Sequence, residues 1–247
     1  MTSGVSKPRV MIIIPALNEM GAIGGVVRSV RAILPDVPVF VIDDHSTDGT
    51  ATVAKEAGAE VVRLPVHLGL GGCVQSGYKL AFEMGVDYVI RMDGDGQHDA
   101  RDVPRILDAL QSTGAEVVIG SRFVEPGGTH TTIPRSLGIL FFRLLLRPVL
   151  NKAIYDPTSG FIGVNQKAIE LFAHTFPLSY PEIEALVVLQ RKRFRFHEIP
   201  CVMHPRLTGK SSINGAKSLK YMIHVLLGVF VNILKIYPVS SNKGRPE

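Results

Sequence analysis

Tryptophan is absent from the 247-residue sequence, and only two residues are cysteines. Cys73 and Cys201 lack the close spacing of metal-binding cysteines, so we interpret both as small core residues of a chain kept in a reducing cytosol. Without tryptophan the chain offers few aromatic platforms for stacking bases, which argues against a nucleic-acid partner. Charged or polar residues interrupt every apolar stretch before it reaches the roughly 20 residues of a membrane span.

The N-terminal residues also lack the apolar segment of a secretory signal. Met1 to Pro8 are mostly small or polar, so we expect a disordered start and no signal peptide. Hydrophobic residues make up 46% of the chain and charged residues 20%, values typical of a globular protein. We expect one large α/β domain over residues 9–214, an amphipathic helix over 215–237 and a flexible tail over 238–247.

Charge is unevenly distributed along the chain. Residues 1–130 carry 11 Lys and Arg against 16 Asp and Glu, a net charge of −5, whereas residues 131–247 carry 16 against 6, a net charge of +10. Basic residues in the second half alternate with apolar ones. This pattern favours a phospholipid surface or a phosphate-bearing acceptor over nucleic acid.

One short apolar run ends in carboxylates. Tyr88 to Met92 reads as a buried parallel strand, and Asp93 and Asp95 follow at its carboxyl end, where open α/β sheets bind ligands. Two carboxylates aimed at one point repel each other unless a cation lies between them, and Gln97 adds a neutral oxygen. The pattern indicates a Mg²⁺ or Mn²⁺ site that also holds a diphosphate; the alternative is a solvated Asp-Gly turn.

Two earlier strands end in similar polar loops, and neither carries the G-x-G-x-x-G of a dinucleotide-binding unit. The strand over 9–14 leads to Glu19, which could bond a base or ribose or could only favour the next helix N-terminus. After the strand over 39–42, one of Asp43 and Asp44 can face a pocket while the other braces the turn. Strands alternating with helices predict an α/β fold whose mostly parallel sheet is covered by helices on both faces.

The second half of the chain contains basic residues at several predicted loops. Arg122 ends a strand and could clamp a phosphate or brace Asp93 through a bidentate pair. Residues 125–132, rich in Gly, Pro and Thr, are predicted to form a mobile lid. Residues 133–148 mix arginines with apolar residues, which predicts a helix in the membrane interface or a core helix whose arginines reach water. Residues 204–212 read as a basic loop that could close over a diphosphate.

The sequence resembles family 2 glycosyltransferases of the GT-A fold, and within them the dolichyl- or polyprenyl-phosphate mannose and glucose synthases. The resemblance covers about residues 9–236. It rests on Ile14-Pro-Ala-Leu-Asn-Glu19, Ile42-Asp-Asp-His-Ser-Thr-Asp-Gly49, Asp93-Gly-Asp95 with Gln97-His98, Gly120-Ser-Arg122, Asp156-Pro-Thr-Ser-Gly-Phe161, and Arg206 with Gly209-Lys-Ser211.

The resemblance implies how a nucleotide sugar would bind. Pro15, Leu17 and Glu19, with Asp43 or Asp44, would hold the nucleobase and ribose. Leu17 stands where an aromatic residue is often found in such enzymes, so base stacking is less strongly implied.

The resemblance also implies a cation and a set of phosphate-binding residues. Asp93 and Asp95 would hold sugar and metal, with Gln97 completing the shell of Mg²⁺ or Mn²⁺, and Arg135 would meet the acceptor phosphate. The residues implied to neutralise the diphosphate are Arg122, Arg206 and Lys210.

The leading hypothesis is an inverting transfer of a hexose, mannose or glucose, from a GDP- or UDP-linked sugar to polyprenyl or dolichyl phosphate. The enzyme would associate peripherally with the cytoplasmic face of the membrane. Because the membrane helices of many bacterial relatives are missing from this sequence, a small separate membrane-anchoring protein is an implied partner. The alternatives are transfer to a sugar hydroxyl in cell-wall or surface-polysaccharide synthesis, and a non-catalytic nucleotide-sugar-binding subunit of a membrane complex.

Overall fold

The computed structural model describes residues 8–124, 133–205, 227–228 and 231, and for residues 133–137 it describes the backbone only. Its strands are β1 (Val10–Ala16), β2 (Val39–Asp43), β3 (Glu60–Arg63), β4 (Tyr88–Arg91), β5 (Val117–Ser121), β6 (Ile162–Asn165) and β7 (Phe196–Pro200). Its helices are α1 (Ile23–Ile33), α2 (Thr50–Glu56), α3 (Gly69–Met84), the 3-10 turn η1 (Ala100–Asp102), α4 (Val103–Thr113), α5 (Ile133–Leu150), α6 (Gln166–His174) and α7 (Pro181–Arg191).

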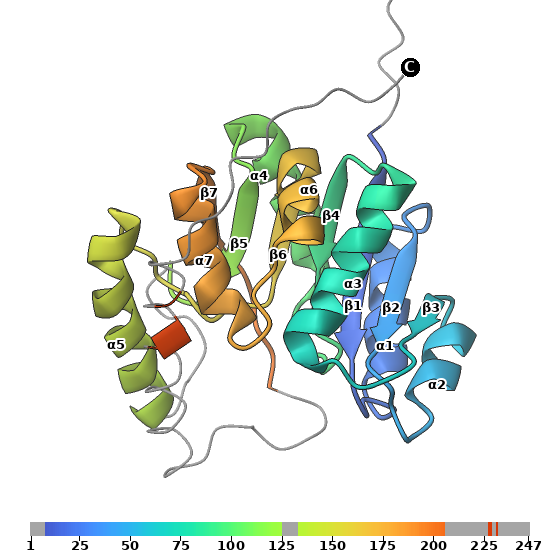
Figure 1. The fold of residues 1–247 in the computed structure, drawn as a ribbon. Helices are drawn as coiled ribbons and strands as arrows, with labels where there is room; N and C mark the ends of the chain where they lie inside the picture. The colour runs from blue at the N-terminus through green and yellow to red at the C-terminus, as the bar shows by residue number, and fades with distance from the viewer. Residues whose placement is uncertain (1–7, 125–132, 206–226, 229–230, 232–247) are drawn as a thin grey trace, which may run out of the picture.

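The strands form one sheet in the order β3-β2-β1-β4-β6-β5-β7 (Figure 1). Neighbouring strands run parallel except β6, which pairs antiparallel with both β4 and β5. The predicted α/β fold with a mostly parallel sheet is therefore confirmed. The sequence did not predict β6, a strand of four residues that directly follows the turn around Asp156.

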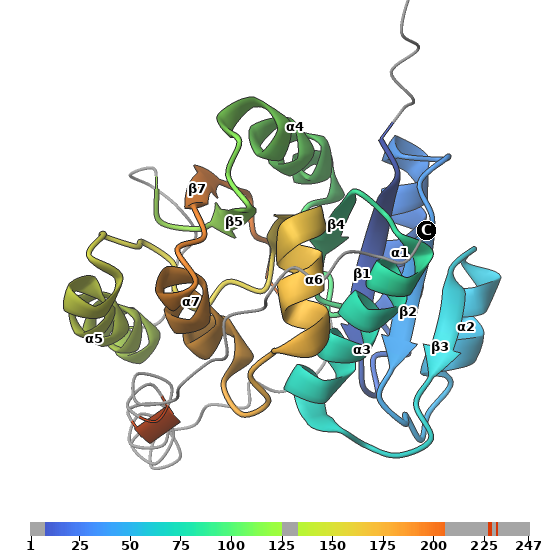
Figure 2. The same ribbon diagram turned by 45° about the horizontal axis from the view of Figure 1, so that its top comes forward.

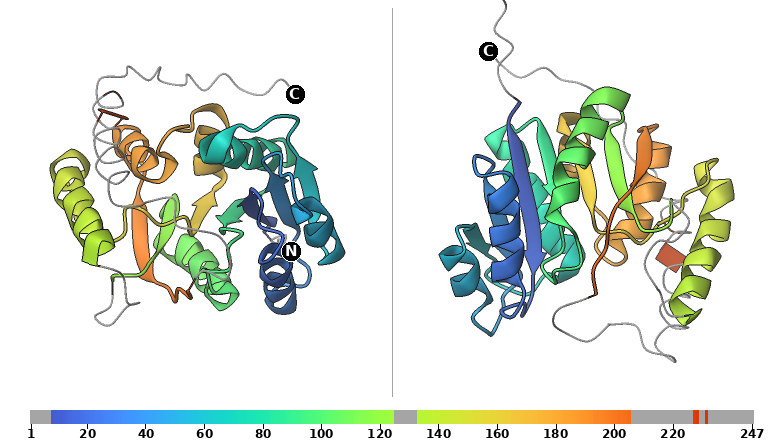
Figure 3. Two further views of the ribbon diagram at one scale, coloured as in Figure 1. Left: turned by 90° about the horizontal axis from the view of Figure 1, so that it is seen from below. Right: turned by 180° about the vertical axis from the view of Figure 1, so that it is seen from behind.

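Helices cover both faces of the sheet because its central strands are apolar on both sides. In β1, Met11 and Ile13 belong to the core under α3, α6 and α7, whereas Ile12 and Ile14 belong to the core under α1 and α4. Figure 2 and Figure 3 show these two helix layers, with α5 outside α7. Alternate side chains of one apolar run thus enter two separate cores.

The parallel register brings three strand ends to one edge of the sheet. Ala16 pairs with Asp43, and the N–H of Asp44 donates to the carbonyl of Ala16 at 2.9 Å. On the other side of β1, the N–H of Met92 donates to the carbonyl of Ile13 at 3.0 Å. The loops after β1, β2 and β4 therefore leave the sheet side by side, as the strand pattern predicted.

Several predicted segments lie outside the described residues. These are the lid over 125–132, the loop from residue 206 onward and most of the C-terminal helix, of which residues 227, 228 and 231 are helical. Among the helices that the structure describes, none combines the length and the apolar character of a membrane span. The longest, α5, carries Arg143, Arg147 and Pro148.

Candidate functional site

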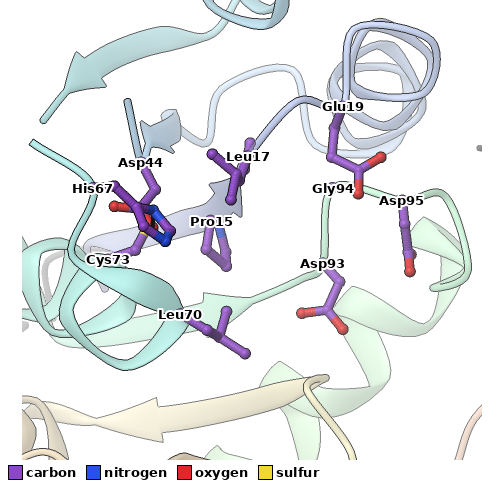
Figure 4. A pocket seen from close by; sticks show the side chains of 11 residues that line it. Pro15, Leu17, Glu19, Asp44, His67, Leu70, Cys73, Asp93, Gly94 and Asp95 are labelled. Carbon is purple, nitrogen blue, oxygen red and sulfur yellow. Dashed lines mark ion pairs between the residues drawn. The ribbon is translucent and has the colours of Figure 1, made fainter. Parts of the chain in front are cut away.

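A cavity of about 280 Å³ opens where β1, β2 and β4 end (Figure 4). Its lining residues are Pro15, Ala16, Leu17, Glu19, Asp44, His67, Leu70, Cys73, Asp93, Gly94 and Asp95. The sequence-predicted residues Pro15, Leu17, Glu19, Asp44, Asp93 and Asp95 are among them. Loops that are far apart in the chain thus contribute to one cavity.

Asp44 and His67 form the end of the cavity beside β2. The Oδ2 atom of Asp44 lies 2.8 Å from Nδ1 of His67, and its Oδ1 accepts the N–H of Leu68 at 2.7 Å. Asp43 is fully buried, and its Oδ1 accepts the N–H of Ser46 at 3.0 Å. One acid of the pair, Asp44, therefore lines the cavity and the other braces the turn, and Asp43 is not among the lining residues.

Cys73 lies at the same end of the cavity. Its Sγ donates to the carbonyl of Ile42 at 3.2 Å. Burial raises the pKa of the Cys73 thiol to about 12, and the negative charge of Asp44 adds to the effect. The thiol is therefore protonated at neutral pH and is not a nucleophile.

Asp95 and Gly94 form part of the other end of the cavity. Asp95 is buried, and its Oδ1 accepts the N–H of Gln97 at 3.0 Å, so the carboxylate is fixed by the turn that follows it. A Cβ at Gly94 would lie 3.4 Å from the carbonyl oxygen of Pro15. The loop between the two aspartates therefore lies against the end of β1.

His98 fixes the backbone of the neighbouring Asp93. The N–H of Asp93 donates to Nδ1 of His98 at 3.0 Å, and the His98 ring stacks on Phe161 with centroids 4.7 Å apart. Burial lowers the pKa of His98, so the ring is neutral at neutral pH and its proton is assigned to Nε2. Nε2 lies 3.7 Å from Oδ2 of Asp93.

Arg91 is a charged residue of this site that the sequence analysis missed. Its Nη2 lies 2.6 Å from Oε1 of Glu182 and 3.6 Å from Oδ1 of Asp93. Burial by itself would lower the pKa of Arg91, but the charges of Glu182 and Asp93 outweigh it and raise the pKa, so the guanidinium is charged. A lone arginine inside an apolar strand was the available signal.

The structure corrects the expectation that Arg122 pairs with Asp93. Its Nε and Nη2 lie 2.6 Å from Oδ2 and Oδ1 of Asp156, and Nη2 also donates to Oγ1 of Thr158 at 2.9 Å. The bidentate pair thus forms with Asp156 and not with Asp93. Arg122 is buried and is not among the residues that line the cavity.

Other predicted residues are not brought into the cavity by the described structure. Gln97 does not line the cavity, and its Nε2 donates to the carbonyl of His204 at 3.3 Å. The side chain of Arg135 and the whole of Arg206 and Lys210 lie outside the described residues, so their predicted roles stay predictions.

The oxygens of Asp93 and Asp95 suit a hard divalent cation. Within the described ranges, no group of three or more His, Cys, Asp or Glu side chains is arranged to hold a metal. Mg²⁺, however, commonly takes only one or two protein carboxylates and completes its shell with substrate phosphates and water. The residues present therefore fit a cation that binds together with a diphosphate.

Comparison with known proteins agrees with this geometry. Residues 11–172, more than half of the chain, match the model of "Glycosyl transferase family 2". The chain belongs to this family. The matched residues include the ends of β1, β2 and β4 and so the whole lining of the cavity.

Two relatives of this glycosyltransferase carry related names. The undecaprenyl-phosphate mannosyltransferase of Micrococcus luteus is 31% identical over 217 residues, which cover 84% of this chain and 88% of the relative. The polyprenol monophosphomannose synthase of Mycolicibacterium smegmatis is 32% identical over 176 residues, which cover 66% of this chain and 63% of the relative. This chain therefore matches less than two thirds of the second relative.

A solved structure shares the fold. The glucosyl-3-phosphoglycerate synthase of Mycobacterium tuberculosis, solved with Mn²⁺ and UDP, superposes with a TM-score of 0.71 at 23% identity, covering 94% of this chain and 82% of that one. The same enzyme was also solved with Mg²⁺ and UDP. The likeness shows that the glycosyltransferase described here has a GT-A fold.

Proposed function

We propose that this family 2 glycosyltransferase transfers a hexose, mannose or glucose, from a GDP- or UDP-linked sugar to a polyprenyl or dolichyl phosphate. The observation that carries the proposal is the cavity itself. It combines the buried Asp44 at one end with the carboxylates of Asp93 and Asp95 at the other, and Pro15 and Leu17 lie between them in Figure 4. This order suits a base, a diphosphate and a sugar laid along the edge of the sheet.

In this proposal each end of the cavity has its own role. The apolar Pro15 and Leu17 would contact the base, and the Asp44–His67 pair would hydrogen-bond to it. Asp93 would hold the sugar, and Asp95 would hold Mg²⁺ or Mn²⁺. A bound divalent cation would stabilise the charge that develops on the leaving diphosphate, an effect on the order of several kcal/mol. Asp95 needs little reorganisation for this role because the Gln97 N–H already fixes it.

The acceptor is proposed from charge and chemistry. A phosphate oxygen is already anionic, so it can attack the anomeric carbon without a general base, whereas a sugar hydroxyl needs one. Burial and Asp44 keep the Cys73 thiol protonated, and His98 already accepts the Asp93 N–H through Nδ1. Neither residue is suited to act as that base. The names of the relatives, polyprenyl-phosphate mannosyltransferases, favour the same acceptor.

A position at the membrane surface is proposed from α5. Leu140 and Leu144 on this helix are 47% and 62% exposed, and Arg143 stacks over the ring of Tyr155 at 4.9 Å. Exposed leucines beside arginines suit the boundary between acyl chains and anionic headgroups. The predicted location, the cytoplasmic face with or without a small anchoring protein, is part of this proposal.

A panel of substrates tests the proposal. UDP-glucose and GDP-mannose are offered with and without polyprenyl phosphate, in Mg²⁺ or Mn²⁺, and lipid-linked hexose is measured. We expect product with one nucleotide sugar, only when both the lipid phosphate and the cation are present. Product formed on soluble sugars alone would contradict the proposed acceptor. Nucleotide-sugar binding without any turnover would contradict an enzymatic role.

A further inference from the structure

Asp93 is surrounded by residues whose roles the family match does not assign. We propose that Arg91, His98, Gly160 and Glu182, together called the Asp93 seat, position the Asp93 carboxylate toward the donor sugar, with Arg91 as the charged centre. The inference rests on the proposed function, because it takes Asp93 to contact that sugar. The seat residues would act through Asp93 and are positioning residues.

The burial of the Arg91 guanidinium costs more free energy than a purely structural role would require. The residue is 1% exposed, and within the described chain its Nε and Nη1 have no hydrogen-bond partner. A buried cation with unsatisfied donors is usually less stable than an apolar side chain of similar volume. Its Nη2 is instead aimed between two carboxylates, Glu182 at 2.6 Å and Asp93 at 3.6 Å. Glu182 thus orients the guanidinium, and the guanidinium faces Asp93.

His98 holds the second oxygen of Asp93 from another side. Its ring is fixed twice, by the Asp93 N–H on Nδ1 and by stacking on Phe161. Nε2 then lies 3.7 Å from Oδ2 of Asp93. At 3.6 and 3.7 Å the contacts from Arg91 and His98 are beyond hydrogen-bond range, so both act on Asp93 through charge and dipole.

Gly160 completes the seat because its lack of a side chain leaves room for the Asp93 carboxylate. A Cβ at this position would lie 2.5 and 2.6 Å from the two carboxylate oxygens of Asp93 and 2.8 Å from Nη2 of Arg91. Contacts this short force one of the groups to move. Only glycine lets the carboxylate occupy the place between Arg91 and His98.

The seat can be tested by comparing the affinity of the chain for a nucleotide with its affinity for the corresponding nucleotide sugar. Calorimetry in Mn²⁺ gives the Kd of UDP and of UDP-glucose, and of GDP and of GDP-mannose. For the pair that binds, the Kd of the nucleotide divided by the Kd of the nucleotide sugar measures the contacts made to the sugar. We expect Arg91→Met to lower this ratio at least tenfold and leave the Kd of the nucleotide within about threefold, since the base end is untouched. Arg91→Lys should restore part of the ratio.

A second variant keeps the test valid if Arg91→Met fails to fold. Gly160→Ala keeps every charge and displaces Asp93, so we expect the same loss in the ratio. Its matched control is Gly25→Ala on α1, where a Cβ meets nothing within 4 Å. In an Asp93→Asn background, Arg91→Met should cause little further loss, because positioning has no effect once its target is gone.

Each outcome separates the seat from the proposed function. An unchanged ratio in Gly160→Ala, or an equal further loss in the Asp93→Asn background, would overturn the seat. A wild-type chain that binds the nucleotide and the nucleotide sugar equally would also overturn it. If the variants lower the ratio as expected but the wild type forms no lipid-linked product, the acceptor is overturned and the seat is supported. Binding of neither pair would overturn both.

Discussion

Buried charges at single residues define much of this site. Asp44, Arg91, Asp95, Arg122 and Asp156 are all less than a tenth exposed. Arg122 bonds to Asp156 through both Nε and Nη2, and the pair holds two loops together. Arg91 has two donors that the described chain leaves unsatisfied, and this difference is why a positioning role is proposed for it and not for Arg122.

The pair of Arg122 and Asp156 should make a large contribution to stability. Asp156→Asn leaves a buried guanidinium without its counter-charge, and we expect the free energy of unfolding to fall by about 3 kcal/mol or more. Urea unfolding followed by circular dichroism measures the change. Arg101→Gln is the matched control, because Arg101 is 77% exposed in its pair with Asp99 and should cost less than about 1 kcal/mol. Equal losses in both variants would contradict this account.

The two thiols should react slowly in the folded chain. Burial raises the pKa of both Cys73 and Cys201 from 9.0 to about 12, so at pH 8 the thiolate fraction is roughly a thousandth of that in an ordinary thiol. The rate of labelling by iodoacetamide should rise about tenfold per pH unit and level off only near pH 12, whereas an ordinary thiol levels off near pH 9. The variants Cys73→Ser and Cys201→Ser separate the two sites, and the chain unfolded in guanidinium is the reference. Rapid labelling of the native chain at pH 8 would refute the prediction.

At the scale of elements, local pattern predicted the strands that have clear ends. The predicted strands over 39–42 and 88–92 correspond to β2 and β4, and nearly every residue in them is buried. By contrast, β6 was missed because four residues after a turn carry no periodic signal. Helix α3 begins at Gly69, in a segment rich in glycine. Its Gly71 packs against the backbone of Leu178, a contact that no local pattern reveals.

The exposed face of α5 should contribute to membrane binding. Leu144→Gln removes an exposed apolar side chain, and we expect partition onto vesicles of phosphatidylglycerol and phosphatidylcholine to fall about tenfold. Co-sedimentation measures the partition, which should also weaken as salt is raised. Met84→Gln on α3, where Met84 is 43% exposed, is the control. If both variants bound vesicles as well as the wild type, α5 would not be the contact.

At the scale of the whole molecule, the sequence predicted six of the residues that line the cavity but not how the buried charges pair. The alternation of strands and helices predicts a mostly parallel sheet, and in such a sheet Asp44, Asp93 and Asp95 follow strands that end at one edge. The partners of the charges are 34 residues apart for Arg122 and Asp156 and 91 for Arg91 and Glu182. Such pairs depend on how the helices and loops pack on the sheet, and a single sequence does not reveal that packing.

A divalent cation and the donor sugar are proposed to bind together at the end of β4. Lipid-linked hexose is measured against Mn²⁺ concentration for the wild type and for Asp95→Asn, a substitution that keeps the side-chain shape and removes the charge. We predict Mn²⁺-dependent product for the wild type and a loss of at least a hundredfold for Asp95→Asn across the titration. Full activity of Asp95→Asn in the absence of any divalent cation would contradict the account.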